Sequence, residues 1–110
     1  MGENFSVLRA EAATDSITLY WERPQGRVGT TYEIYFKDAN HTEADFAFVG
    51  STQKTHYTIE NLQANTQYKI LVKGIYQVDM ALTEDESESV QIEKKIKQQT
   101  ITVHTFNRSV

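Results

Sequence analysis

Histidine, serine and cysteine side chains are the first candidates for catalysis or metal binding in this sequence. His41, His56 and His104 lie far apart in the sequence and lack the close spacing of metal ligands. No serine stands in a G-x-S-x-G motif, and the absence of cysteine removes thiol nucleophiles, metal thiolates and disulfides together. The sequence therefore predicts a protein that is not an enzyme, with no catalytic site, no metal site and no cofactor.

The second candidate for chemistry is the acidic segment of residues 77–88. Its carboxylates are the oxygen ligands that calcium prefers, but their order does not follow the D-x-[DN]-x-[DN]-G loop. We therefore expect a long, mobile, metal-free loop. Its acidic residues are Asp79, Glu84, Asp85, Glu86 and Glu88.

Three of the five asparagines stand in the N-x-[ST] context of an N-glycosylation acceptor. These candidate acceptors are Asn4, Asn40 and Asn107, and Asn40, in a segment rich in turn residues, is the best placed. The pattern favours an extracellular glycoprotein, although chance occurrence is an open alternative.

Size and charge narrow the class of protein further. The chain has 110 residues, enough for one domain, and a formal net charge of -4. A mildly acidic surface argues against nucleic acid or an anionic membrane as partner. No apolar run approaches the roughly 20 residues of a membrane span, so we expect a soluble chain with no direct membrane insertion. Residues 1–4 are interpreted as an expression start or linker.

Short alternating segments predict the elements that would position any site. They are rich in Val, Ile, Thr, Tyr and Phe, and clusters of Gly, Asn, Asp and Ser separate them. This pattern predicts an all-β fold, a two-sheet antiparallel immunoglobulin-like sandwich of seven strands, with a barrel as the alternative. The expected strands cover residues 5–12, 16–23, 30–37, 46–49, 54–60, 67–76 and 89–96.

The inward positions of these strands define a predicted core. Tyr68, just after a tight corner, is expected to bury its ring and to bond the corner with its hydroxyl, as in a tyrosine corner. Trp21 lies on the apolar face of its strand and is read as core rather than as a sugar-stacking platform. The predicted core residues are Trp21, Tyr32, Ile34, Leu62, Tyr68, Ile70 and Val72.

The last segment, residues 97–110, has three interpretations. We treat it as a C-terminal extension, either an extra strand or the start of a following domain. Because residues 100–106 also alternate, the segment is the true last strand if the acidic loop is longer than supposed.

The outward faces of two expected strands form a candidate interaction patch. In a sandwich the third and sixth strands are neighbours, so their outward side chains should lie together. An apolar stripe with lysines at its edges suits protein docking. The candidate patch is Tyr35, Lys37, Lys69, Leu71, Lys73 and Ile75.

Several of these segments together resemble the fibronectin type III family over residues 5–96. The carrying motifs are Ser16-Ile17-x-Leu19-x-Trp21, Tyr32-x-Ile34-x-Phe36 and Tyr57-x-Ile59-x-x-Leu62-x-x-x-Thr66-x-Tyr68-x-Ile70-x-Val72. The chain departs from the family pattern at Ala64, where proline is usual, and at Asn65, where glycine is usual. Asparagine tolerates positive φ better than other non-glycine residues, so the corner is still expected.

The resemblance implies a binding or spacing module without catalytic activity. We therefore expect a non-catalytic spacer or protein-interaction module of a larger extracellular or cell-surface protein, such as an adhesion protein or receptor ectodomain. Its partners would be neighbouring domains of the same chain and an extracellular protein or glycan, and the isolated module would be a monomer. The alternatives are a carbohydrate-binding or accessory module of a secreted bacterial glycan-degrading enzyme and, less favoured, a small hydrolytic domain.

Overall fold

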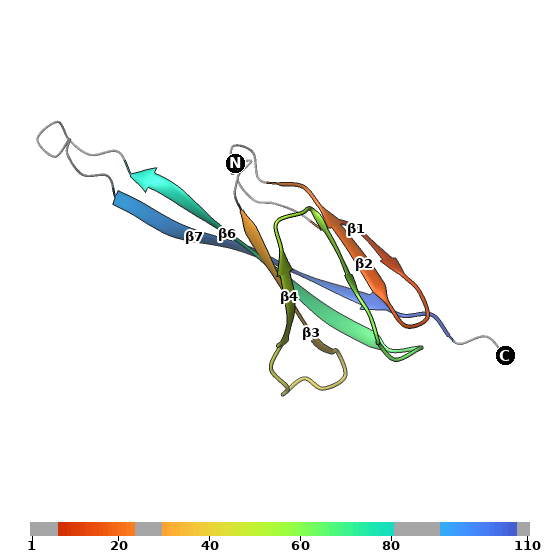
Figure 1. Cartoon of the computed structure of the whole chain (residues 1–110). Helices are drawn as coiled ribbons and strands as arrows, with labels where there is room; N and C mark the ends of the chain where they lie inside the picture. Colours follow the sequence, from red (N-terminus) through yellow and green to blue (C-terminus); the bar gives the residue numbers. More distant parts are fainter. Residues whose placement is uncertain (1–6, 24–29, 81–90, 108–110) are drawn as a thin grey trace, which may run out of the picture.

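Two antiparallel β-sheets pack face to face in the computed structural model, which describes residues 7–23, 30–80 and 91–107 (Figure 1). One sheet has three strands in the order β1-β2-β5, and the other has four in the order β4-β3-β6-β7. The predicted seven-stranded sandwich is thus confirmed. The strands are β1 (Val7–Ala12), β2 (Ile17–Trp21), β3 (Thr31–Asp38), β4 (Ala47–Thr52), β5 (His56–Ile59), β6 (Gln67–Met80) and β7 (Gln91–His104).

Alternation along each strand builds the core between the sheets. In β2, Ile17, Leu19 and Trp21 are buried while the residues between them are half-buried, because successive side chains point to opposite faces. The Trp21 ring lies 5.1 Å from the ring of Tyr32, centroid to centroid. All seven predicted core residues are buried, with exposed fractions of 7% or less.

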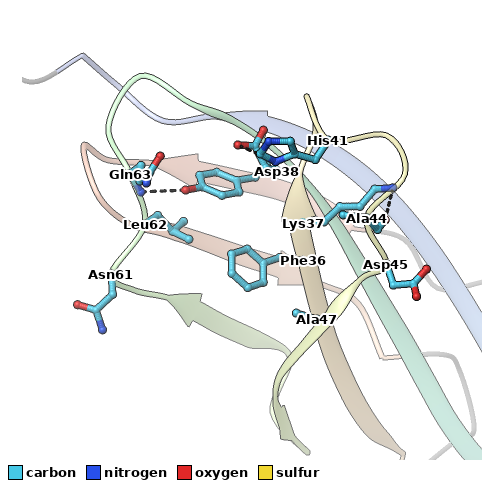
Figure 2. A pocket seen from close by; sticks show the side chains of 11 residues that line it. Phe36, Lys37, Asp38, His41, Ala44, Asp45, Ala47, Asn61, Leu62 and Gln63 are labelled. Carbon is cyan, nitrogen blue, oxygen red and sulfur yellow. Dashed lines mark hydrogen bonds and ion pairs between the residues drawn. The ribbon is translucent and has the colours of Figure 1, made fainter.

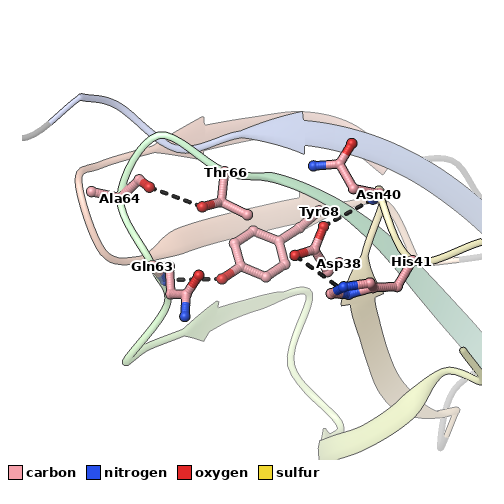
Figure 3. A network of polar contacts seen from close by, with 7 residues as sticks. All are labelled: Asp38, Asn40, His41, Gln63, Ala64, Thr66 and Tyr68. Atoms are coloured by element: carbon pink, nitrogen blue, oxygen red, sulfur yellow. Dashed lines mark hydrogen bonds and ion pairs between the residues drawn. The ribbon is translucent and has the colours of Figure 1, made fainter.

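The corner between β5 and β6 has the geometry of a tyrosine corner. The Tyr68 hydroxyl accepts a hydrogen bond of 2.9 Å from the backbone N–H of Gln63 (Figure 3). Asn65 has a φ of 52°, and Asn61 also has a positive φ, at 63°. Both asparagines occupy the left-handed region at which glycine is the least strained residue. Asn65 therefore supplies the conformation for which the family usually uses glycine.

The last two strands differ from the sequence-based expectation. Residues 77–80, expected in the acidic loop, extend β6 to Met80, while residues 81–88 lie outside the described residues. The last strand does not end at residue 96 but continues to His104. Residues 97–104 are therefore neither an extra strand nor a separate unit, and the proposed boundary at residue 96 falls inside β7.

The reason for this difference is the pairing of β7 with β6. Fourteen residue pairs run without a register shift from Gln67 opposite His104 to Met80 opposite Gln91. The polar residues after Ile96 resemble a strand end in the sequence, but backbone pairing does not depend on side-chain polarity. Ile101 and Val103 then pack against the core. In Figure 1, β6 and β7 continue together beyond the end of β3.

Candidate interaction surface

The strand register brings the six residues of the candidate patch together on one sheet face. Tyr35 lies opposite Leu71, and Lys37 lies opposite Lys69 in the neighbouring strand. Lys73 and Ile75 follow at alternate positions of β6, so they share this outward face. The structure therefore places the predicted residues as one surface, which we call the outer face of the four-stranded sheet.

Phe48 of β4 is the most exposed aromatic side chain of this face, and the sequence did not identify it. The Phe48 side chain is 58% exposed, and its ring meets that of Tyr35 at 5.5 Å in an edge-to-face contact. A register shift between Ile34 and Tyr35 pairs Tyr35 with Phe48 rather than with Val49. Without this bulge Phe48 would face the core, because a one-residue slip exchanges the two faces of a strand.

The apolar residues of the outer face differ in exposure. Leu71, expected as an exposed anchor, is only 8% exposed, so it forms the floor beneath its neighbours. Ile75 is half-buried and pairs with Ile96 of β7, which is 55% exposed. Phe48 and Ile96, rather than Leu71, are thus the large apolar side chains that a partner would cover.

Charged groups surround Tyr35 on this face. The Tyr35 hydroxyl donates a hydrogen bond of 2.8 Å to Glu33 Oε1, and the Lys73 ammonium lies 4.8 Å from the centre of the Tyr35 ring. The carboxylate of Glu33 holds the phenol in its protonated form and raises the pKa of Tyr35. These contacts fix the Tyr35 ring beside Phe48 and orient Lys73 toward it.

The two remaining lysines have different environments. The Lys37 ammonium donates to the carbonyls of Ala44, at 3.0 Å, and Thr42, at 3.4 Å, and lies 5.2 Å from the Phe46 ring centre. Lys37 therefore binds and stabilises the loop between β3 and β4. Lys69, in contrast, is exposed.

A shallow pocket of about 400 Å³ lies between the β3–β4 loop and the tyrosine corner (Figure 2). Phe36 and Leu62 form its apolar floor, and Asp38, His41 and Asp45 belong to its rim. Asp38 Oδ2 is 3.7 Å from His41 Nδ1, but the His41 side chain is 72% exposed (Figure 3). With its side chain so open to water, His41 has no desolvated environment that would prepare it for acid–base catalysis.

The other residues with possible chemistry are dispersed over the fold. His56 belongs to β5 of the three-stranded sheet, His104 ends β7, and His41 follows β3. Among the described residues no group of three or more His, Cys, Asp or Glu side chains could hold a metal ion. No helix in the described part of the chain has the length and apolarity to cross a membrane.

Two of the three candidate glycosylation acceptors are described. Asn40 is exposed, and its backbone N–H donates a hydrogen bond of 2.8 Å to Asp38 Oδ1 in the turn after β3. Thr42, the third residue of this sequon, is exposed as well. Asn107 is exposed after the end of β7. Asn4 lies outside the described residues.

Fold and surface together define a small β-sandwich with an aromatic and basic sheet face, the architecture of a common interaction module in multidomain proteins. Residues 3–93 match the family model for the fibronectin type III domain. The chain belongs to the fibronectin type III family, as the motifs in its sequence indicated. Domains of this family are generally non-catalytic.

Comparisons with individual proteins agree with this assignment. The chain is 30% identical over 70 residues to human "Target of Nesh-SH3", a match that spans 64% of this chain and only 7% of that protein. The fibronectin type III domain of the human collagen alpha-1(XX) chain is similar in structure, with a TM-score of 0.67 and 25% identity over 96% of this chain and 87% of that one. Domains A168–A170 of titin superpose with a TM-score of 0.58 and 20% identity, covering 89% of this chain and 30% of that one.

Proposed function

We propose that this domain is a non-catalytic protein-interaction and spacer module of a larger extracellular chain, and that it contacts its partner through the outer face of the four-stranded sheet. The observation that carries the proposal is the exposure of Phe48 beside Tyr35, on the β4 and β3 side of that face. Aromatic side chains, phenylalanine included, are enriched in the cores of protein interfaces relative to the rest of the surface.

The charges around this aromatic pair support a partner with an acidic surface. Lys69 is exposed, and Lys73 is oriented by its contact with the Tyr35 ring. Lysines at the rim of an interface speed association with an acidic partner more than they strengthen the final complex. The on-rate should therefore fall as salt is added.

Extracellular placement of the parent chain is the second part of the proposal. It is supported by the accessible sequon at Asn40 and by the exposed Asn107. Secretion of the chain from an animal cell line, followed by glycosidase treatment, tests whether the Asn40 acceptor on which this part rests can be used. We expect the glycosidase to lower the mass of the chain, and to lower it less in Asn40→Gln. An equal decrease in the two chains would contradict the use of this acceptor.

Site-specific photo-crosslinking tests the interaction surface. A photoreactive phenylalanine replaces Phe48 in one variant and exposed Thr58, on β5 of the opposite sheet, in a matched control. We expect protein adducts from position 48. The unlabelled chain, added as a competitor, should suppress these adducts, whereas the double variant Phe48→Ser/Ile75→Ser should not. Equal adducts from both positions would refute the proposed face.

A carbohydrate-binding function is the second candidate, because exposed Phe48 beside half-buried Tyr35 also resembles a surface on which sugar rings stack. A glycan array distinguishes the two functions. Binding to a glycan that is lost in Phe48→Ser would favour the carbohydrate function over a protein partner.

A further inference from the structure

The four strands at the sheet edges differ in how they resist pairing with another chain. β1 has a register shift between Val7 and Arg9, and its Arg9 and Glu11 side chains form an exposed ion pair at 3.2 Å. β5 has only four residues, and β4 has six and carries the bulge opposite β3. Short strands, bulges and charges are the usual devices that keep sheet edges from associating.

β7 lacks these devices in its second half. It is a fourteen-residue edge strand, and its pairing with β6 shows no register shift. From Gln98 to His104 it contains no Asp, Glu, Lys, Arg, Gly or Pro. Its outward side chains in this part, including Thr100, Thr102 and His104, are exposed. An edge that is long, regular and uncharged is a template for another strand.

The backbone bonds at the end of β7 show which groups face this edge. The N–H of Thr105 donates to Thr66 O at 2.9 Å, toward β6, whereas the N–H of Phe106, beyond the strand end, donates to Ala13 O at 2.9 Å and its carbonyl accepts from the N–H of Asn65 at 2.9 Å. Because N–H direction alternates along an antiparallel strand, Gln98, Thr100 and Thr102 direct their N–H and C=O groups away from β6. β6 is the only described strand that pairs with β7, and β1 of the other sheet contacts β7 without pairing with it.

We propose that this edge is a self-association surface, on which a second copy of the chain places its own β7 antiparallel and joins the two four-stranded sheets into one. This goes beyond the proposed function, since it uses the backbone edge of the sheet, and it departs from the expectation of a monomeric module. Of the residues of the outer face that a partner would cover, it includes only Ile96. Antiparallel pairing of two identical strands gives a two-fold, isologous interface, and two-fold dimers are the commonest homo-oligomers.

Two limits fix the register of this pairing. The bond from Phe106 to Ala13 occupies the edge beyond His104. At the other end, Ile96 directly follows the consecutive lysines 94 and 95. An antiparallel ladder between these limits is centred on Thr100, so that Thr100 faces Thr100 of the second copy and Ile96 faces His104 of the second copy.

This register is compatible with the charges of the strand. Lys97 would face Val103 of the second copy, and the two Lys97 side chains would lie six residue positions apart, about 20 Å. That separation exceeds the Debye length of about 8 Å at physiological ionic strength, so they repel little. The 55% exposed side chain of Ile96 would be covered in part by the second copy.

Sedimentation equilibrium of the 110-residue chain, from about 10 μM to about 1 mM, tests the proposal. We expect the average mass to rise toward that of a dimer, with a Kd on the order of 10⁻⁴ M for a small interface. Thr102→Pro removes an N–H that faces the free edge, and it leaves the hydrogen bonds to β6 in place. Thr100→Lys places two lysines opposite each other at the two-fold axis of the dimer. Each should weaken association about tenfold or more, while Thr58→Lys on β5 should not.

A single cysteine reports the register, because the chain has none of its own. Thr100→Cys should form a disulfide-linked dimer on mild oxidation much faster than the Thr58→Cys control. A chain that stays monomeric at about 1 mM would overturn the proposal. So would variants Thr100→Lys and Thr102→Pro that remain folded and associate like the unchanged chain, or equal oxidation of the two cysteine variants.

Discussion

Thr105 and Gln63 are joined by a hydrogen bond of 2.7 Å, from the Thr105 hydroxyl to the Gln63 carbonyl, across 42 residues of sequence. The same hydroxyl accepts the N–H of Thr66 at 3.0 Å, and Thr105 is fully buried. Gln63 also gives its N–H to the Tyr68 hydroxyl. The corner before β6 is therefore held from two sides, by Tyr68 and by the residue that follows β7.

Thr105→Val is expected to destabilise the fold by about 1–3 kcal/mol, because it keeps the volume of the side chain but leaves corner groups without their partner. Thr105→Ser, which retains the hydroxyl, should lose less. Urea denaturation followed by Trp21 fluorescence measures both. A valine variant with an unchanged midpoint would show that the hydroxyl is dispensable.

Tyr68→Phe removes only the hydroxyl that binds the Gln63 N–H and should cost about 1–3 kcal/mol. Tyr20→Phe is the matched control, since the Tyr20 hydroxyl is exposed and its hydrogen bond to Glu11, at 3.5 Å, is long and therefore weak. Its change should stay within about 0.5 kcal/mol. Equal stability losses for the two variants would argue against a special role of the corner.

Trp21→Ala should cost about 3–5 kcal/mol, the range for truncation of a large buried aromatic side chain. Trp21 is 4% exposed and packs on Tyr32, so its removal leaves a cavity between the sheets. Thermal or urea unfolding followed by circular dichroism provides the measurement. A variant as stable as the unchanged chain would contradict this core packing.

Gly50→Ala is expected to destabilise the sandwich by about 1–3 kcal/mol through overpacking. A Cβ at Gly50 would overlap the hydroxyl of Tyr57 and would lie 3.1 Å from its Cζ atom. Tyr57→Phe in the same chain removes the nearest atom and should recover part of the loss. If the double variant is no more stable than Gly50→Ala, the loss of stability does not come from overlap with the Tyr57 hydroxyl.

Tyr35 should titrate above its ordinary pKa of 10.0, because the Glu33 carboxylate binds its phenolic proton and disfavours the phenolate. The folded chain then holds this proton more tightly than the unfolded chain. The stability from this contact is present below pH 10 and is lost as the pH rises through the folded pKa. Difference ultraviolet titration against Tyr35→Phe measures the shift, and Glu33→Gln should lower the pKa. Persistence of the shift in Glu33→Gln would point to another cause.

Local alternation in the sequence was sufficient to predict the sandwich and its core. Trp21, Ile34 and Val72 stand at inward positions of short alternating runs. Because one face of each strand is buried, the alternation determines which residues point into the core. The corner was also predictable, since the hydrogen bond of Tyr68 closes over only five residues. The grouping of the patch followed from the adjacency of β3 and β6.

Tertiary structure alone decided which side chains the surface exposes. The bulge in the β3–β4 pair turns Phe48 outward, and neighbouring side chains cover Leu71. The length of β7 followed from its pairing with β6, and the role of Thr105 depends on a contact across 42 residues. A period-two pattern fixes the faces of one strand, but bulges, strand ends and sheet edges depend on the partner strand, which the local sequence does not specify.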